Sequence, residues 1–314
     1  FHIYTKLAIF VGNSCYRLQR YEKKTSKDMT PSEFISLIKK DLNYQPTPEQ
    51  EHVLTVFSQF LADRNPHSVM VLRGSAGTGK TTLAAAMVST LHRLGQKLTL
   101  MAPTGRAAKV FSLHSNLPAY TIHRRIYREK NYTGISGIFN LNDNRYRRML
   151  FVVDEASMIG SRPATGDITF GTASLLDDLI QYVYSGDGCR LLLIGDNAQL
   201  PPVGETEAPA LNTALLEGYG LKVWECSLAS VLRQSQFSGI LYNATQIRAL
   251  IDEPVLPRIR LWSFTDVQRI SGDELIESLA TSYTEAGIDD TIVLTRSNKR
   301  ANVYNQGIRA SVLD

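Results

Sequence analysis

The chain has 314 residues, of which 43% are hydrophobic and 20% are charged, and its formal net charge is +4. This length allows about two globular domains, and the composition is that of a globular chain. The modest positive charge permits a polyanionic partner without requiring one. Three cysteines without metal-ligand spacing argue against a disulfide framework and predict a reducing, cytoplasmic location.

The first part of the chain offers no membrane anchor and little pattern. No segment has the ~20 consecutive apolar residues that a membrane-spanning helix needs, so we expect no membrane insertion. The first methionine is Met29, and residues 1–28 show no clear periodicity. We therefore treat residues 1–45 as an N-terminal extension without an assigned function. Within it, residues 32–42 place apolar side chains at helical spacing and predict a helix.

A second helix is predicted to begin after Thr47. Pro48 suits its first position, and Gln50 three residues after Thr47 completes the spacing of a capping box. Gln50 therefore has a structural explanation as a cap. Its amide could instead recognise adenine, because an amide both donates and accepts hydrogen bonds.

A glycine-rich loop with the pattern G-x-x-x-x-G-K-[ST] follows a predicted strand at residues 69–72 and precedes a predicted helix at residues 83–94. Such a loop points backbone amides at phosphates, and the helix N-terminus adds partial positive charge. A chance Gly-rich turn is the alternative, and the flanking strand and helix argue against it. We predict a nucleoside triphosphate site in which Lys80 reaches the β- and γ-phosphates and the Thr81 hydroxyl binds Mg²⁺. The loop residues predicted to bind this nucleotide are Gly74, Ser75, Ala76, Gly77, Thr78, Gly79, Lys80, Thr81 and Thr82.

A second strand, predicted at residues 97–102, also ends in a loop of small residues before a helix. Open α/β sheets bind ligands at the carboxyl ends of their parallel strands. Thr104, the Gly105 amide and Arg106 are therefore candidates for phosphate contacts, with an ordinary strand-to-helix turn as the alternative.

Residues 120–148 interleave basic and aromatic side chains, among them Arg124 and Arg125. This mixture suits a single-stranded nucleic acid, because cations follow its backbone and rings stack on its bases. A solvated face is the alternative. Residues 137–141 and the chain from residue 145 onward predict a small hairpin that projects from the surface.

A third strand, predicted at residues 150–153, is followed directly by Asp154 and Glu155. At the end of a strand beside the phosphate loop, Asp154 can hold Mg²⁺ through its water shell. Glu155 can orient and deprotonate the attacking water. These roles predict hydrolysis of the bound nucleotide.

Two later strands are also followed by candidate residues. The strand predicted at residues 190–194 ends in a polar loop where Gln199 could bridge to a terminal phosphate. The strand predicted at residues 221–228 precedes Arg233, whose planar cation could neutralise charge on a transferred phosphoryl group. A surface salt bridge is the alternative for Arg233.

The remaining chain begins a second unit in our prediction. Prolines at positions 254 and 257 mark a break. They are followed by a predicted helix at residues 273–283, a strand at residues 291–294 and a helix from residue 296 to the end.

Over roughly residues 45–314, this ordered set of motifs resembles the superfamily 1 DNA helicases of the RecD-like and Dda-like branch. The segments that carry the resemblance are Gly74–Thr82, Ala102–Lys109, Thr121–His123, Asp154–Met158, Gly195–Val203 and Arg233. The resemblance implies that Gln50 recognises adenine and that Arg233 contacts the γ-phosphate. It also implies contacts to a DNA single strand. With the basic candidates above, the predicted nucleic-acid residues are Pro103, Thr104, Arg106, Thr121, His123, Arg124 and Arg125.

The resemblance implies an α/β fold, with a RecA-like parallel sheet of the P-loop NTPase type flanked by helices. The implied first RecA-like ATPase domain spans residues 46–250, with a small inserted hairpin subdomain at about residues 124–149. Residues 251–314 would form a connector and the beginning of a second RecA-like domain. That domain's His-Lys-x-Gln-Gly and Thr-Arg motifs are not in the sequence. We therefore expect this chain alone to bind ATP weakly without unwinding DNA.

The implied activity is an ATP-dependent DNA helicase, with ATP and Mg²⁺ as cofactors and movement in the 5′-to-3′ direction. Its partners would be single-stranded DNA and single-strand/duplex junctions. Two alternatives stay open. A P-loop ATPase of another class would show no DNA-stimulated turnover, and a non-enzymatic nucleic-acid-binding module would bind DNA equally well with or without nucleotide.

Overall fold

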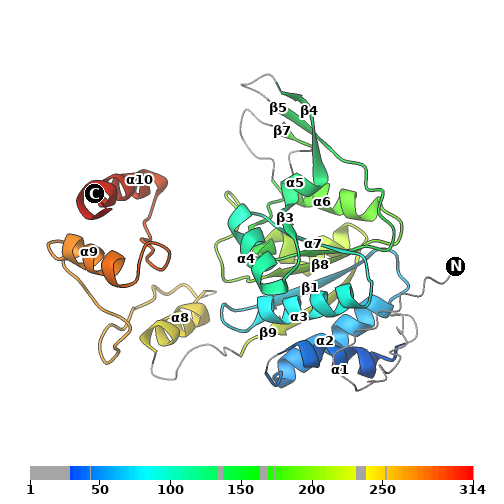
Figure 1. The fold of residues 1–314 in the computed structure, drawn as a ribbon, viewed down its shortest axis with the longest axis horizontal. Coiled ribbons are helices and arrows are strands. Elements are labelled where there is room, and N and C mark those ends of the chain that lie inside the picture. Colours follow the sequence, from blue (N-terminus) through cyan, green and yellow to red (C-terminus); the bar gives the residue numbers. More distant parts are fainter. Residues whose placement is uncertain are drawn as a thin grey trace, which may run out of the picture. The chain divides into compact units, whose positions relative to one another are not determined.

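The structure, a computed structural model, describes residues 29–42, 44–132, 137–162, 169–172, 174–230, 238–251 and 253–313. These residues fall into two compact units, one within Phe1–Arg233 and the other within Gln234–Asp314 (Figure 1). The division into domains at residues 46 and 251 stays a prediction. Among the described residues, we find no helix with the length and apolar character that crossing a bilayer demands.

A six-stranded sheet forms the centre of the first unit, with the strand order β3-β2-β6-β8-β1-β9 (Figure 1). All neighbouring pairs in it are parallel, so the carboxyl ends of the strands share one edge. This confirms the predicted RecA-like parallel sheet, although the short β3 was not predicted. The strands are β1 (Ser68–Gly74), β2 (Leu98–Ala102), β3 (Ala119–Thr121), β6 (Leu150–Val153), β8 (Arg190–Gly195) and β9 (Lys222–Leu228).

Helices cover both faces of this sheet. They are α1 (Pro31–Asp41), α2 (Pro48–Ala62), α3 (Lys80–Arg93), α4 (Gly105–Ser115), α5 (Ile122–Ile126), α6 (Leu175–Tyr184) and α7 (Thr213–Gly218). Short 3₁₀ turns span Ala156–Met158 and Pro209–Leu211. The predicted capping box of α2 is confirmed, and Thr30 and Glu33 form a second one on α1.

Two apolar cores hold the helices to the sheet. Side chains alternate along β1, so that Val69 and Val71 pack in the core with α5, α6 and α7. Met70 and Leu72 pack in the other core, with α1, α2, α3 and α4. All four are fully buried, which explains why residues 69–72 of β1 are apolar at every position instead of alternating. Each such side chain contributes about 1.5–3 kcal/mol by leaving water.

A second, three-stranded sheet of order β4-β5-β7 joins the chain between α5 and α6. Its strands are β4 (Tyr127–Tyr132), β5 (Gly137–Leu141) and β7 (Thr169–Phe170). The predicted hairpin is present, but its predicted pairing is wrong. β5 pairs antiparallel with β4, which precedes it, and parallel with the distant β7. The charged residues of β4 led us to predict a nucleic-acid surface, whereas the segment is a strand with aromatic residues. Its Tyr127 is buried in the core that contains Val69 and Val71.

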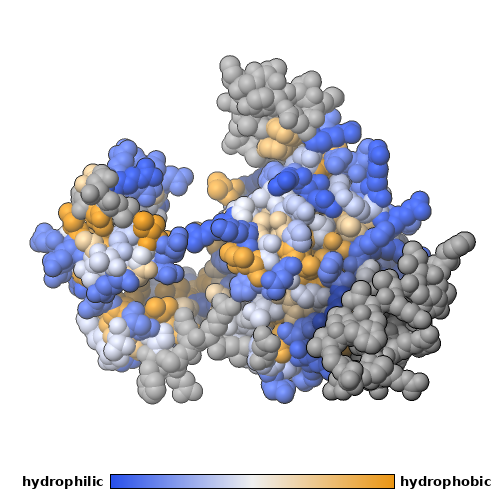
Figure 2. Space-filling view, viewed as in Figure 1, coloured by the Kyte–Doolittle hydropathy of each residue, from blue (hydrophilic) through white to orange (hydrophobic). Residues whose placement is uncertain are grey.

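The second unit consists of helices and irregular chain. Its helices are α8 (Gly239–Ala249), α9 (Leu275–Glu285) and α10 (Asn298–Ile308), followed by a π-turn at Arg309–Leu313. The two predicted helices are confirmed by α9 and α10, and the π-helix continues the second of them to Leu313, whereas α8 was not predicted. The predicted strand at 291–294 is wrong, because the described residues 253–313 contain no strand. A strand needs a hydrogen-bonding neighbour, and Leu294 here is 86% exposed. Apolar areas are visible on this unit (Figure 2).

Candidate nucleotide site

The loop between β1 and α3 depends on its three glycines. Gly77 and Gly79 have φ angles of 81° and 85°, in the left-handed region that side chains disfavour. A Cβ on Gly74 would lie 2.8 Å from the backbone oxygen of Leu228. Because Gly79 has no side chain to cap α3, the first N–H groups of this helix face the loop and suit an anion.

Lys80 lies against this loop. Its Nζ donates hydrogen bonds to the backbone oxygens of Gly74, at 2.6 Å, and Ser75, at 2.8 Å. The Thr78 hydroxyl also donates to the Ser75 oxygen, at 2.8 Å. The ammonium group is therefore held beside the backbone amides that suit phosphate oxygens.

Asp154 brings a carboxylate from the end of β6 to the beginning of α3. Its Oδ2 accepts a hydrogen bond from the Thr81 hydroxyl at 3.1 Å. The side chain is nearly inaccessible to solvent, at 5% exposure. Burial, and then the neighbouring Glu155 carboxylate, raise the pKa of Asp154 to about 6. A positive charge at this position would relieve both effects.

The backbone turns sharply at Glu155. Its φ of 55° and ψ of 37° are left-handed, a conformation that costs a non-glycine residue free energy. The Glu155 N–H donates to Asp154 Oδ1 at 3.0 Å, which stabilises the turn. The Glu155 backbone therefore leaves the extended path of β6 directly after Asp154.

Thr81 and Asp154 fit a magnesium ion. Both supply oxygen ligands, and Mg²⁺ is commonly held by one or two carboxylates together with phosphate oxygens and water. No group of three or more His, Cys, Asp or Glu side chains suitable for a metal occurs among the described residues. A magnesium ion here would therefore take the rest of its ligands from a nucleotide and water.

The loop after β8 adds Gln199 and Asp196, and the turn after β6 adds Ser157; sequence analysis gave no separate role to Asp196 or Ser157. Gln199 Oε1 accepts a hydrogen bond from the Ser157 hydroxyl at 2.8 Å. Asp196 accepts hydrogen bonds from the N–H of Ala76, at 3.1 Å, and of Ala198, at 2.9 Å. A signal for Asp196 was available, because it directly follows a buried strand, as Asp154 does.

Gln50 forms the predicted cap of α2 and a second contact that was not predicted. It completes the capping box with Thr47, through hydrogen bonds of 3.1 and 3.2 Å. Its Nε2 also donates to the backbone oxygen of Thr78 at 3.2 Å. The side chain is fully buried, so it fastens α2 to the phosphate loop. Recognition of adenine by Gln50 stays a prediction.

Glu49 holds the chain that leads toward Arg233, and its role was not predicted. Its carboxylate accepts hydrogen bonds from the N–H groups of Ala229, at 2.9 Å, and Ser230, at 3.0 Å. The hydrogen bonds from Ser230 and Ala229 lower the pKa of Glu49. Arg233 itself lies outside the described residues.

The predicted nucleic-acid residues come together at the ends of β2 and β3. These strands pair in parallel, with Ala102 beside Thr121, so the segments that follow the two strands are neighbours. The hydroxyls of Thr104 and Thr121 cap α4 and α5. Arg106 and Arg124 are exposed near these caps.

Two of these predicted contacts pack within the protein. His123 is partly buried, its ring lies edge-on to Phe170 at 5.0 Å, and burial lowers its pKa. Arg125 donates to the Tyr146 hydroxyl at 2.7 Å, and its guanidinium carbon lies 4.9 Å from the centre of the Tyr146 ring. These contacts fix the base of the small sheet. Binding of DNA by either residue stays a prediction.

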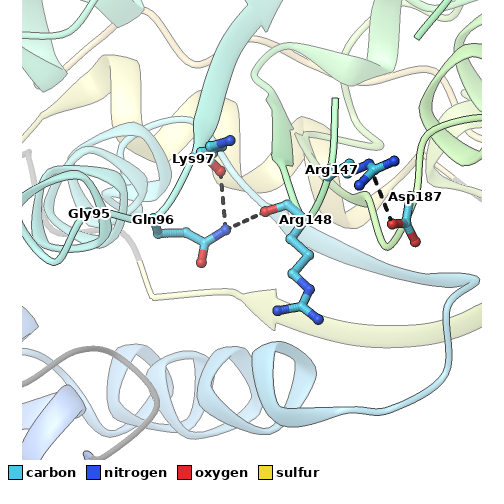
Figure 3. A pocket seen from close by; sticks show the side chains of 6 residues that line it. All are labelled: Gly95, Gln96, Lys97, Arg147, Arg148 and Asp187. Atoms are coloured by element: carbon cyan, nitrogen blue, oxygen red, sulfur yellow. Dashed lines mark hydrogen bonds and ion pairs between the residues drawn. The ribbon is translucent and has the colours of Figure 1, made fainter. Parts of the chain in front are cut away.

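A cavity of about 410 Å³ lies elsewhere, near the amino ends of β2, β6 and β8. Its lining residues are Gly95, Gln96, Lys97, Arg147, Arg148 and Asp187 (Figure 3). The Gln96 amide donates to the backbone oxygens of Lys97 and Arg148, at 3.2 and 2.7 Å. The guanidinium groups of Arg147 and Arg148 point in different directions (Figure 3). This cavity is at the edge opposite the phosphate loop, and its cations do not converge on one ligand.

Comparison with known proteins agrees with this geometry. The chain is 34% identical to the ATP-dependent RecD2 DNA helicase of Deinococcus radiodurans over 137 residues, which are 44% of this chain and 16% of that protein. It is 24% identical to the ATP-dependent DNA helicase dda of Enterobacteria phage T4 over 285 residues, which are 85% of this chain and 57% of that protein. The chain thus spans less than two thirds of the length of either relative.

A solved structure of the Pif1 helicase from Bacteroides, in complex with ADP-AlF3 and ssDNA, aligns with 85% of this chain and 57% of its own, at a TM-score of 0.44 and 16% identity. The sequence matches confirm the predicted resemblance to the RecD-like and Dda-like branch. Residues 47–249 match the family model described as AAA domain. Because this match covers well over half of the chain, the protein belongs to the AAA domain family and is a P-loop nucleotide-binding protein.

Proposed function

We propose that this chain is the ATP-binding part of an ATP-dependent DNA helicase. It would couple ATP hydrolysis to movement along a single strand in the 5′-to-3′ direction and to unwinding of a duplex. The observation that carries the proposal is the meeting of Lys80, Thr81 and Asp154 at one edge of the sheet, with Glu155 adjacent. The similarity to the RecD2 and dda helicases supports the DNA-dependent part.

Each residue of this edge has a task in the proposal. Lys80 would exchange its hydrogen bonds to loop carbonyls for bonds to the β- and γ-phosphates, at little cost because the ammonium is already in place. Thr81 and Asp154 would hold Mg²⁺, which supplies positive charge between the phosphates. Glu155, on its separate turn, would orient the attacking water and accept its proton.

The γ-phosphate would be contacted by two further residues. Gln199, which the Ser157 hydroxyl holds in place, would bridge to a γ-phosphate oxygen. Arg233 would neutralise the charge that develops during phosphoryl transfer. Glu49 supports this arrangement, because it fastens residues 229 and 230 at the start of the segment that contains Arg233. Gln50 would recognise adenine from its buried position beside the loop.

A DNA single strand would cross the neighbouring ends of β2 and β3. Pro103, Thr104, Thr121 and His123 would line its path, because the pairing of β2 with β3 places their loops side by side. The exposed cations near this path, Arg106 and Arg124, would contact the phosphates. Arg125 would contribute mainly by holding Tyr146. The projecting sheet of β4, β5 and β7 would meet a single-strand/duplex junction.

The domain organisation is part of this proposal. Residues 46–250 would form the first RecA-like ATPase domain, with an insertion at about residues 124–149. Residues 251–314 would form a connector and the beginning of a second RecA-like domain. Closure of two such domains on one nucleotide would exclude water and assemble the catalytic groups.

The test is ATP hydrolysis by the protein extended through the motifs of a second RecA-like domain, measured with and without single-stranded DNA. We expect DNA to stimulate turnover and Lys80→Ala to abolish it. The same protein should displace a strand from a duplex with a 5′ single-stranded tail. Turnover that ignores DNA would favour an ATPase of another class. DNA binding without any turnover, and unchanged by nucleotide, would favour a non-enzymatic binding module.

A further inference from the structure

We propose that Asp196 competes with a nucleotide phosphate for the Ala76 N–H, and that this competition couples nucleotide binding to the position of Gln199. The inference rests on the proposed ATP site and concerns the regulation of that site. β8 lies between β1 and β6 in the sheet. Asp196, the first residue after β8, therefore stands between the phosphate loop and the loop of Asp154 and Glu155.

The contact to the phosphate loop joins a buried carboxylate to an exposed loop residue. Asp196 Oδ2 accepts from the Ala76 N–H at 3.1 Å, and the residue is only 3% exposed. Ala76 is the third residue of the glycine-rich loop, whose amides suit phosphate oxygens in loops of this type. A carboxylate oxygen thus uses a donor that a phosphate oxygen would also use. One N–H cannot serve both oxygens at full strength.

The competition is electrostatic as well as geometric. A phosphate oxygen at Ala76 would lie within a few ångströms of the Asp196 carboxylate, and two anions at that separation repel each other. Burial of the Asp196 carboxylate strengthens this repulsion, because the effective dielectric constant is lower and dissolved ions screen less on that side, whereas the exposed Ala76 leaves the other side open to solvent. Nucleotide binding would therefore draw the Asp196 carboxylate away from Ala76.

Movement of Asp196 would be passed on to Gln199. The other carboxylate oxygen, Oδ1, accepts from the Ala198 N–H at 2.9 Å. The Gln199 N–H donates to the Asp196 backbone oxygen at 3.1 Å. These two bonds make residues 196–199 a single turn, and the Gln199 side chain at its end is bonded to Ser157. A phosphate that displaces Asp196 thus shifts the residue proposed to contact the γ-phosphate.

The Asp196→Asn variant separates these effects. Asparagine has nearly the same size, carries no charge and offers one acceptor oxygen in place of two. The asparagine side-chain oxygen should keep accepting from the Ala198 N–H, because asparagine typically forms such a turn with the backbone two residues on. Ala76 is then released and the repulsion removed. The Asp196→Ala variant also releases Ala76, but it removes the acceptor that organises the Gln199 turn.

The experiment measures equilibrium binding of ATP, ADP and adenosine to the 314-residue chain and its variants. We expect Asp196→Asn to bind ATP about tenfold more tightly than the parent, an effect typical of one removed repulsive charge in a partly buried site. Affinity for adenosine, which has no phosphate, should stay unchanged. In the extended protein, Asp196→Ala should hydrolyse ATP far more slowly than Asp196→Asn, despite equally tight ATP binding.

The matched control is Asp63→Asn. Asp63 bonds Ser68 at 2.8 Å, at the start of β1, whereas the phosphate loop follows the end of that strand roughly 20 Å away. This variant also removes one partly buried negative charge, but far from the phosphate loop, so its ATP affinity should equal that of the parent. Thermal melting of all variants confirms that the compared proteins are folded.

The outcomes are distinguishable. If the parent binds ATP and folded Asp196→Asn binds it equally or more weakly, the inference fails while the proposed ATP site stands. Equal tightening for adenosine would also overturn the inference, because phosphate would then play no part. If the parent binds no nucleotide at all, the proposed function fails, and the inference fails with it.

Discussion

The buried carboxyl of Asp154 should make folding stability depend on pH in a way that Asp154→Asn abolishes. Asp154 is buried beside Glu155, and both the burial and the Glu155 carboxylate raise its pKa. Together they outweigh Thr81 and Lys80, which lower it. The substitution replaces a group that ionises with a neutral amide of similar size. The measurement is made with EDTA present, so that no divalent cation compensates the charge.

The magnitude follows from the two pKa values. The pKa of Asp154 is about 6 in the folded protein, against an ordinary value of 3.8. The folded protein therefore binds this proton more tightly than the unfolded chain does. The associated stability is fully present below about pH 3.8 and is lost as the pH rises through 6. At about 1.36 kcal/mol per pH unit, the loss is about 3 kcal/mol, with little solvent screening at 5% exposure.

The assay is urea denaturation of parent and variant between pH 4 and pH 8. The stability of Asp154→Asn relative to the parent should increase by about 2 kcal/mol across this range, because part of the full effect is already lost at pH 4. Any constant offset reflects the acceptor oxygen that asparagine lacks, so the pH dependence is the diagnostic quantity. A difference that stays flat, or that shrinks toward pH 8, would refute the assigned environment of Asp154.

Asp63→Asn provides a control of opposite sign. Burial alone would raise the pKa of Asp63, but hydrogen bonds outweigh it and lower the pKa well below the ordinary value. The bonds come from the Asn65 N–H and from the side chains of Ser68, Lys222 and Trp224. The unfolded chain therefore binds the proton more tightly, and this stability is present at neutral pH and lost on acidification. The Asp63→Asn variant should be less stable than the parent at pH 7, with a deficit that shrinks as the pH falls.

Three other predictions concern binding and packing. Lys80→Ala should weaken nucleotide binding, whereas Glu155→Gln should preserve binding and slow hydrolysis by about 10²–10⁴-fold; equal loss of binding in both would contradict the role of Glu155. Gly74→Ala should cost about 1–3 kcal/mol in urea denaturation, because its Cβ would lie 2.8 Å from a backbone oxygen of β9. Gly105→Ala is the control, since no described atom lies within 4 Å of its added Cβ. Arg124→Ala should reduce the slope of log affinity for single-stranded DNA against log salt concentration by about the contribution of one phosphate contact. An unchanged slope would show that this side chain belongs to a solvated face.

Much of the nucleotide site could be predicted from the sequence because its signals are local. The loop from Gly74 to Thr82 lies between an apolar strand and a helix. The loop motif, the strand and the helix are consecutive in the sequence, so each supports the prediction of the other two. The capping box of Thr47 and Gln50 needs only a three-residue spacing. Asp154 and Glu155 directly follow a buried strand, so their place at the ligand-binding edge follows from the general architecture of parallel sheets.

Pairing between distant segments could not be predicted in the same way. The residues of β4 have both the charges of a nucleic-acid surface and the aromatic content of a strand, and only its pairing with β5 decides between them. Residues 291–294 have the composition of a strand but pair with no strand among the residues described. A strand is stabilised by hydrogen bonds to its neighbour, so its existence depends on sequence elsewhere.

The sequence by itself determined which segments fold locally and which residue types bind phosphate and metal, because helix caps, glycine turns and apolar runs act over a few residues. Tertiary structure decided which of these groups touch. The strand order β6-β8-β1 brings Asp196 to the Ala76 N–H across 120 residues of chain, and burial of Gln50 brings its amide to Thr78. Such contacts depend on how two cores pack against one sheet, and no local pattern encodes that packing.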